Sequence, residues 1–307
     1  MTLRVTVLGT AGAVPTPERN VSGLLVNREG DRLLLDAGEG TQRQMMRFNT
    51  GFAVSDIFLT HLHGDHCLGL PGLVQTWNFT DREAALTIHA PRGTRDSVQG
   101  LVHAADTHPD FPLTVQEVEP GDVAMEGDGY RVEAVAAAHR TDAVGYALIE
   151  AERKGRFDRE TAEDLGVPPG PMFSRLHEGE PVELEDGTVV RPEQVVGEPR
   201  PGRRVVYTGD TRPTGDVIEA ADGADLLVHD ATFADERHER ARKTGHATAR
   251  EAGEVAAEAG AKRLALTHFS SRYAGELGRL RSEAEAAFDG EVLVPDDGDR
   301  IEVPLPE

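Results

Sequence analysis

Apolar residues recur along this chain in short runs, some alternating with polar residues and some continuous, as in β-strands. Longer segments between the later runs carry apolar residues at the spacing of helical turns. The predicted strands are Leu3–Leu8, Gly23–Asn27, Arg32–Asp36, Ile57–Thr60, Leu86–Ala90, Leu113–Val118, Tyr130–Ala136, Val144–Glu150, Arg204–Thr208, Leu226–His229, Arg263–Thr267 and Val292–Val294. The predicted helices are Leu68–Phe79, Thr94–Ala105, Thr248–Ala259 and Gly275–Phe288.

The order of these elements favours an α/β fold built around two sheets. Early strands follow one another in hairpins, whereas the later strands alternate with helices. Because each sheet and each helix must bury an apolar face, the simplest packing places two sheets in the middle and helices on both outer faces. We therefore expect residues 1–307 to form a single domain.

Residues 151–200 break this rhythm, because they are rich in glycine, proline and charge and show little apolar periodicity. A polar stretch of this length inside a compact domain is usually functional or disordered. We interpret it as an arm inserted within the domain. A surface insertion without a function is the alternative.

Composition adds a strong bias of charge. The chain has 54 acidic and 32 basic residues, a net charge of −22, and its lysines are Lys154, Lys243 and Lys262 alone. An acidic, lysine-poor chain resembles proteins of salt-accumulating microbes. Net charge alone argues against a nucleic-acid partner. In molar salt the Debye length falls to about 3 Å, so local charge decides binding there.

The single cysteine, Cys67, excludes a disulfide framework and a thiolate zinc site. Any zinc must therefore be held by histidine or carboxylate side chains. The segment Met1–Leu8 has neither a basic start nor a long apolar stretch, and no run of about 18 apolar residues occurs in the chain. We expect a soluble cytoplasmic protein without a signal peptide.

The densest group of candidate ligands is His61-Leu62-His63-Gly64-Asp65-His66, directly after a predicted strand. His61 and His63 lie two residues apart in a tight turn and can reach one ion, while Asp65 and His66 point to a neighbouring ion. Imidazole and carboxylate ligands suit Zn²⁺. A solvated polar loop is the alternative, and the residues described next argue against it.

Three further candidate ligands follow later strands: His139, Asp210 and His268. The ends of strands gathered on one edge of a sheet are where α/β folds build their sites. Each residue alone is a weak signal. Together with the hexapeptide they supply seven ligands, enough for two metal ions that share one of them.

This set resembles the signature of the metallo-β-lactamase superfamily. The resemblance implies an αββα four-layer sandwich with a dinuclear zinc site at its edge. It also implies a ligand for each position: His61, His63 and His139 on one zinc, Asp65, His66 and His268 on the other, and Asp210 between them.

Four smaller features resemble the ribonuclease Z family of this superfamily over nearly the whole chain. They are the loop Gly9–Pro15 leading to Arg19-Asn20, the turn Asp36–Gln42, the segment Gly245-His246-Ala247-Thr248 before a helix, and Leu165–Pro171 in the arm after the basic Arg153–Arg156. In the turn, Asp36 is expected to orient the metal loop through a hydrogen bond. Thr248 is expected to cap the following helix.

The resemblance implies a zinc-dependent endoribonuclease that removes the 3′ trailer from precursor tRNA and leaves a 3′-hydroxyl on the tRNA. Two Zn²⁺ per subunit would supply the hydroxide that attacks the phosphodiester. Asp65 would orient this nucleophile and accept its proton, and His246 would assist the departing oxygen. Asp230 would orient His246 or a zinc ligand. The family also implies a homodimer and an arm that grips tRNA.

Two other functions remain open at this point. A phosphodiesterase, thioesterase or lactonase for small substrates would share every zinc ligand, and only the arm and His246 favour the nuclease over it. A catalytically inactive RNA-binding subunit is the second alternative, but such proteins usually lose ligands. Five other histidines, His89, His103, His108, His177 and His238, have no motif around them and are interpreted as structural or surface residues. Cys67 is interpreted as packing under the metal loop.

Overall fold

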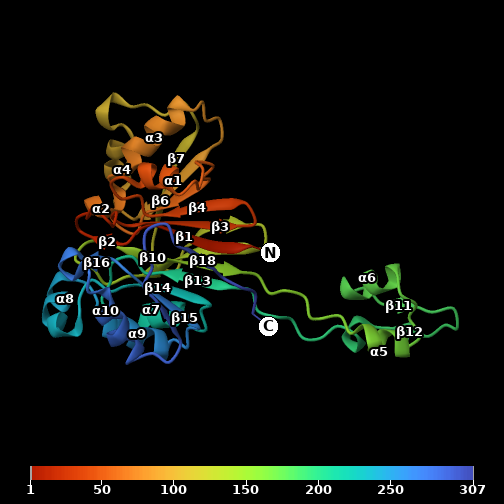
Figure 1. Cartoon of the computed structure of the whole chain (residues 1–307). Helices are drawn as coiled ribbons and strands as arrows, with labels where there is room; N and C mark the ends of the chain where they lie inside the picture. The colour runs from red at the N-terminus through yellow and green to blue at the C-terminus, as the bar shows by residue number, and fades with distance from the viewer. Residues whose placement is uncertain (1, 307) are drawn as a thin grey trace. The chain divides into compact units, whose positions relative to one another are not determined.

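The computed structural model describes residues 2–306, which form two compact units (Figure 1). The body comprises residues 2–149 and 203–305, and the arm comprises residues 150–202 with Pro306. The body holds every candidate ligand named above. The two units are described separately below.

The first sheet of the body has seven strands. In spatial order they are β18 (Arg300–Glu302), β1 (Leu3–Gly9), β3 (Gly23–Arg28), β4 (Asp31–Leu35), β5 (Asp56–Phe58), β6 (Leu86–Pro91) and β7 (Leu113–Val118). The pairs from β18 to β4 are antiparallel and those from β4 to β7 are parallel. The parallel half directs the carboxyl end of β5, and with it the metal loop, to one edge of the sheet.

The second sheet also has seven strands. Their order is β17 (Glu291–Leu293), β15 (Arg263–Thr267), β14 (Leu226–Asp230), β13 (Arg204–Tyr207), β10 (Val144–Glu150), β9 (Tyr130–Ala136) and β8 (Val123–Gly127). The four strands from β17 to β13 are parallel, so β13, β14 and β15 end on the same edge. A small parallel pair, β2 (Ala11–Gly12) with β16 (Phe269–Ser270), links an early loop to the segment after β15.

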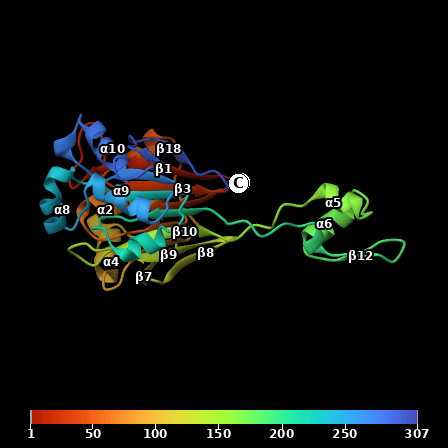
Figure 2. The same cartoon turned by 90° about the horizontal axis from the view of Figure 1, so that it is seen from below.

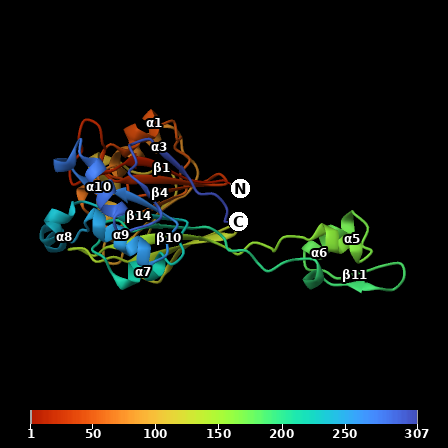
Figure 3. The ribbon, with the colours of Figure 1, turned by 60° about the horizontal axis from the view of Figure 1, so that its bottom comes forward.

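Helices cover the outer faces of both sheets (Figures 1 and 3). The first sheet carries α1 (Thr41–Arg47), α3 (Leu70–Phe79) and α4 (Arg95–Val102), and the short α2 (Gly64–Cys67) lies in the metal loop. The second carries α7 (Gly215–Ala220), α9 (Ala249–Glu258) and α10 (Leu277–Glu285), with α8 (His238–Thr244) before α9. The result is the four-layer αββα sandwich that the sequence predicted.

Alternation along the strands creates three apolar layers. In β3, Leu24 and Val26 face the second sheet, while Leu25 faces the helices outside. Phe58 and Tyr146 meet between the sheets with ring centroids 5.1 Å apart. This period of two is the reason that each strand can bury both faces in a four-layer fold.

The arm has its own small core, although its sequence predicted no regular element. It contains α5 (Arg159–Asp164), α6 (Pro171–His177), β11 (Val182–Glu183) and β12 (Val189–Val190), which are labelled in Figure 1. Figure 2 shows α5, α6 and β12 from below. The buried residues of this core are Ala162, Val167, Leu176, Val182, Val190 and Val195. They are too few and too scattered in sequence to show a period, so the pattern missed them.

Other elements also differ from the prediction. The predicted helix Leu68–Phe79 begins two residues later, at Leu70, and Leu68 and Gly69 form a turn between α2 and α3. Gly69 packs so closely on the Gly38 carbonyl oxygen that a Cβ there would lie 2.2 Å from it. The short elements α1, α7, α8, β8 and β18 were not predicted. Within residues 2–306, no helix has the length and apolar character needed to cross a membrane.

Candidate metal centre

The hexapeptide after β5 folds into a tight loop that brings its ligands inward. His61 and His66 are completely buried, and Asp65 and His66 lie in α2. His61 Nε2 lies 2.9 Å from His63 Nδ1. The six residues thus hold two ligands before the short helix, His61 and His63, and two within it, Asp65 and His66.

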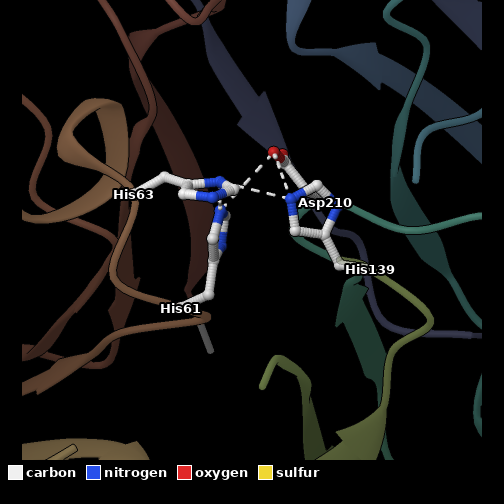
Figure 4. Close-up of side chains that lie close together, drawn as sticks. All are labelled: His61, His63, His139 and Asp210. Atoms are coloured by element: carbon white, nitrogen blue, oxygen red, sulfur yellow. Dashed lines mark hydrogen bonds and ion pairs between the residues drawn. The ribbon is translucent and has the colours of Figure 1, made fainter. Parts of the chain in front are cut away.

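Two residues that follow other strands, His139 and Asp210, complete the first group of ligands with His61 and His63 (Figure 4). His139 follows β9, and its Nε2 lies 3.2 Å from His63 Nδ1. Asp210 follows β13, and its Oδ2 lies 3.6 Å from His61 Nε2 and 4.0 Å from His139 Nε2. Three imidazole nitrogens and one carboxylate oxygen thus face a common point.

A second group lies directly beside it and shares Asp210. The other carboxylate oxygen, Asp210 Oδ1, lies 3.3 Å from both His66 Nε2 and His268 Nε2. His268 Nε2 is 3.1 Å from Asp65 Oδ2, which is 3.6 Å from His66 Nε2. The structure therefore brings all seven predicted ligands together and places Asp210 between the two groups.

The donor set fits two cations. Facing imidazole nitrogens repel one another unless a proton or a cation lies between them. Asp210 Oδ1 is buried and accepts no hydrogen bond within residues 2–306, which is costly for a carboxylate oxygen that nothing else satisfies. His268 also holds a left-handed backbone, φ 62°, a strained conformation typical of functional sites. Nitrogen and oxygen ligands of this kind suit Zn²⁺.

Hydrogen bonds from outside the cluster fix the orientation of its imidazole rings. His139 Nδ1 is 2.8 Å from the Gly245 carbonyl oxygen, so this nitrogen carries the proton and Nε2 is free to bind a metal. His268 Nδ1 is 2.8 Å from Thr232 Oγ1. Thr232 was missed from the sequence, although its position two residues after the strand-end Asp230 is a usable signal.

The buried carboxylate of Asp36 holds His66 in the same way. Asp36 Oδ2 lies 2.7 Å from His66 Nδ1 and accepts a hydrogen bond of 2.8 Å from the Tyr207 hydroxyl. Asp36 Oδ1 accepts the Thr60 backbone N–H at 2.7 Å. The hydrogen bond between Asp36 and the metal loop, expected from sequence, is present, and the Asp36 carboxylate accepts it.

Comparison with known proteins agrees with this geometry. The profile of the Metallo-beta-lactamase superfamily matches residues 16–268. A protein of Halorubrum lacusprofundi named Ribonuclease Z is 62% identical over all of this chain and 99% of its own length, and one of Natronomonas pharaonis with the same name is 59% identical over the full length of both. The crystal structure of the short form of human tRNase Z superimposes with a TM-score of 0.71 at 27% identity, covering 98% of this chain and all of that one.

The chain belongs to the ribonuclease Z family of the metallo-β-lactamase superfamily. Its membership explains why the seven side chains from separate segments meet at one edge of the sandwich. The fold of the superfamily brings the ends of β5, β9, β13 and β15 to this edge.

Beside the seven ligands, this ribonuclease Z family member carries a histidine–carboxylate pair. His246 Nδ1 lies 2.9 Å from Asp230 Oδ2, and Asp230 Oδ1 accepts the Thr232 hydroxyl at 2.6 Å. The ring of His246 stacks near that of His268, with centroids 5.1 Å apart. Asp230 thus contacts His246, one of the two roles predicted for it, and supports His268 through Thr232.

Charges in the cluster are strongly coupled. Burial lowers the pKa of His61 well below its ordinary value, and the nearby His66 lowers it further. Burial also opposes protonation of His66, but Asp210 and Asp36 outweigh it and raise the pKa of His66 well above the usual range. Burial likewise opposes ionisation of Asp210, yet His268 and His66 hold its pKa well below the ordinary value. Asp210 is therefore ionised and attracts positive charge.

The remaining candidates have structural or surface positions. His89 is buried, stacks on Phe58 at 4.4 Å and contacts Asp56 through Nε2 at 2.8 Å. His103 and His108 contact each other on the surface. Cys67 is buried, and its thiol lies 3.3 Å from the His63 carbonyl oxygen, under the metal loop as predicted. Thr248 caps α9 in a capping box with Glu251, also as predicted.

Proposed function

We propose that this chain is an endoribonuclease that removes the 3′ trailer from precursor tRNA and leaves a 3′-hydroxyl on the tRNA. The observation that carries the proposal is the pairing of a seven-ligand cluster with the adjacent His246–Asp230 pair, in a chain that aligns end to end with proteins named Ribonuclease Z. The cluster supplies a site for hydrolysis, and the pair supplies a proton.

In this proposal two Zn²⁺ ions are held by the groups described above, with Asp210 common to both. Bound there, zinc ions would supply a nucleophile at neutral pH and Lewis-acid stabilisation of the phosphate. A small phosphodiesterase would use the same ligands, so the metal centre alone does not define the substrate.

The protein's own groups would then position the reacting atoms. Asp65 Oδ2 accepts the Ala13 backbone N–H at 2.7 Å and contacts His268, which aims the carboxylate toward the shared space. Asp65 is thereby placed to orient the attacking oxygen and to accept its proton. His246, held by Asp230, is placed to give a proton to the departing 3′ oxygen of the tRNA.

The arm would supply recognition of the tRNA. Its core lets it keep a shape of its own. Within the arm, Arg153 donates to the Pro306 carbonyl oxygen and Arg200 donates to the Lys154 carbonyl oxygen. Lys154 and Arg156 add positive charge that suits phosphates. We further infer a homodimer that works in the cytoplasm of a cell rich in salt, in keeping with the acidic composition.

The test is incubation of the purified chain, in concentrated salt with zinc, with a precursor tRNA that carries a 3′ trailer. We expect one cut immediately 3′ of the discriminator base, and we expect chelation or Asp65→Ala to abolish it. Cleavage of a small nitrophenyl phosphodiester without cleavage of the precursor would refute the proposal in favour of a small-substrate phosphodiesterase.

A further inference from the structure

Three arginines from three different elements line a cavity beside the metal cluster. Arg140 follows β9, Arg240 lies in α8, and Arg272 lies in the turn after β16. Together with His246 and His268 they border a cavity of about 280 Å³, the arginine pocket. The pocket therefore opens directly onto the groups that would carry out hydrolysis.

These three guanidinium groups have no carboxylate partner in the described part of the chain. Within residues 2–306 none of them forms an ion pair or a side-chain hydrogen bond, whereas Arg250 and Arg279 on neighbouring helices lie 3.2 and 2.8 Å from acidic groups. In a chain with 54 acidic residues, such a group of cations around one cavity is unexpected. Like charges held close together repel, so the arrangement favours an anion from outside the chain.

A buried aromatic ring holds two of the arginines in place. The Cζ atoms of Arg240 and Arg272 lie 6.0 and 5.7 Å from the centroid of the Phe233 ring, which is 5% exposed. Such cation–π contacts fix the stem and leave the donors available to a ligand. The same ring packs edge-on against His246, with centroids 6.2 Å apart. The positive charge is thus placed relative to the histidine before any ligand arrives.

We propose that the arginine pocket binds the phosphate group of a nucleotide next to the bond that is cut. Arginine presents paired donors that match phosphate oxygens, and its charge persists at every physiological pH. Since RNA is taken as the source of this phosphate, the proposal rests on the proposed function. It adds three positioning residues, Arg140, Arg240 and Arg272, to the reaction.

A neighbouring cavity favours a nucleotide over a free anion as the ligand. Ser270 and Ser271 border both the arginine pocket and a second cavity of about 370 Å³. That second cavity is lined in part by apolar Phe269, Ala274 and Leu277, a surface suited to a base or a ribose. A nucleotide offers a phosphate for the first cavity and a base or ribose for the second, whereas inorganic phosphate offers a group for the first alone.

The experiment measures binding, so it does not depend on turnover. A fluorescein-labelled trinucleotide of 2′-O-methyluridine is titrated into the zinc-loaded chain, and its integrity is checked by chromatography. We compare the wild type with the double variant Arg240→Gln/Arg272→Gln. The control is Arg95→Gln, because Arg95 is an exposed arginine in α4, the helix that packs on the first sheet. We expect about tenfold weaker binding or worse in the double variant and wild-type affinity in the control.

Salt dependence gives a second measurement that a general structural defect would not reproduce. The slope of log affinity against log salt should become shallower by about 0.7 for each phosphate that the variant no longer neutralises. If the double variant melts at a lower temperature than the control, its weaker binding could reflect unfolding, and the same binding measurements are then made on Arg140→Gln. Weaker binding with a shallower slope in Arg140→Gln supports the proposal, and unchanged binding overturns it.

The remaining results separate this proposal from the proposed function. Equal binding by all variants overturns the arginine pocket, whether or not the wild type cleaves precursor tRNA. Arginine-dependent binding of the trinucleotide without cleavage of precursor tRNA supports the pocket and refutes the proposed function. Binding of inorganic phosphate as tight as that of the trinucleotide overturns the assignment to a nucleotide.

Discussion

Replacing Asp36 by asparagine should weaken the metal site without disrupting the fold. The backbone of Asp36 is left-handed, φ 57°, a conformation that asparagine tolerates well among non-glycine residues. The Thr60 N–H, 2.7 Å from Oδ1, requires an acceptor, so the asparagine oxygen takes this position. The amide NH₂ then occupies the position of Oδ2, 2.7 Å from His66 Nδ1.

This orientation forces the opposite tautomer on His66. Nδ1 must accept the amide proton, so the ring proton moves to Nε2, the nitrogen that faces Asp210 and Asp65 at 3.3 and 3.6 Å. A protonated nitrogen cannot bind a metal. Removal of such a supporting carboxylate typically costs about 10–100-fold in metal affinity, or about 1.4–2.7 kcal/mol.

The matched control is Tyr207→Phe, which removes one hydrogen bond to Asp36 and leaves the His66 tautomer unchanged. It should cost about 1 kcal/mol of folding stability and little metal affinity. Asp36→Ala, by contrast, removes the acceptor of four buried donor groups, which are the backbone N–H and the hydroxyl of Thr60, the Tyr207 hydroxyl and His66 Nδ1. Each unsatisfied buried donor costs about 1–3 kcal/mol, so this variant should destabilise the whole chain. Competition of each variant with a zinc chelator, together with thermal melting, measures both quantities. If Asp36→Asn holds two ions as tightly as Tyr207→Phe, the tautomer argument is wrong.

Four further predictions concern the arm, the proposed proton donor, the candidate metal centre and the buried thiol. The first variant replaces residues 155–197 by a short glycine linker, which joins the chain where the backbones of Arg153 and Arg200 pair. It should retain turnover of a small phosphodiester but reduce kcat/KM for precursor tRNA about a hundredfold, or about 2.7 kcal/mol. An equal reduction on both substrates would contradict the proposed role of the arm. Asp230→Asn should lower kcat by about a hundredfold at unchanged zinc content, because the asparagine no longer orients the ring of His246, the proposed proton donor. Burial lowers the pKa of His268, but the carboxylates around it outweigh burial and raise this pKa to about 9. The ring is therefore protonated at neutral pH without metal, so zinc binding should release protons and should tighten as the pH rises toward 9. An indicator dye that shows no proton release would count against this prediction. Burial raises the pKa of the Cys67 thiol to about 11, so iodoacetamide at mildly alkaline pH should label it only after unfolding.

The sequence was most informative where chemistry and period coincide. The strands around the candidate site were predicted because β-strands with both faces buried read as continuous apolar runs, as in Leu226–His229. The ligands were found because four ligand-type residues occur within six positions after such a strand. The family resemblance implied that Asp210 lies between the two groups. Which of its oxygens faces which histidine required the structure, since spacing in sequence carries no information on this point.

Elements that depend on distant partners escaped prediction. β18 (Arg300–Glu302) is three residues long and pairs with β1 at the other end of the chain, so no local pattern marks it. The arm core joins residues such as Ala162 and Val195, which lie far apart in a segment rich in polar and charged residues. Thr232 and Thr60 are common polar residues whose roles appear only through the histidines that they contact. Hydrogen bonds of this type depend on the tertiary fold, so composition and period do not reveal them.

The acidic composition and the proposed RNA substrate are compatible once charge is considered locally. In molar salt the Debye length is about 3 Å, so acidic residues that do not contact a bound phosphate repel it little. Groups in direct contact retain their effect, and the cations that border the cavity beside the cluster are Arg140, Arg240 and Arg272, without carboxylate partners in residues 2–306. Transfer to dilute salt would extend the repulsion of 54 acidic side chains over the whole molecule. Affinity for RNA should therefore fall less steeply with added salt than for a basic nuclease, because screening weakens the attraction at the arginine pocket and the general repulsion together.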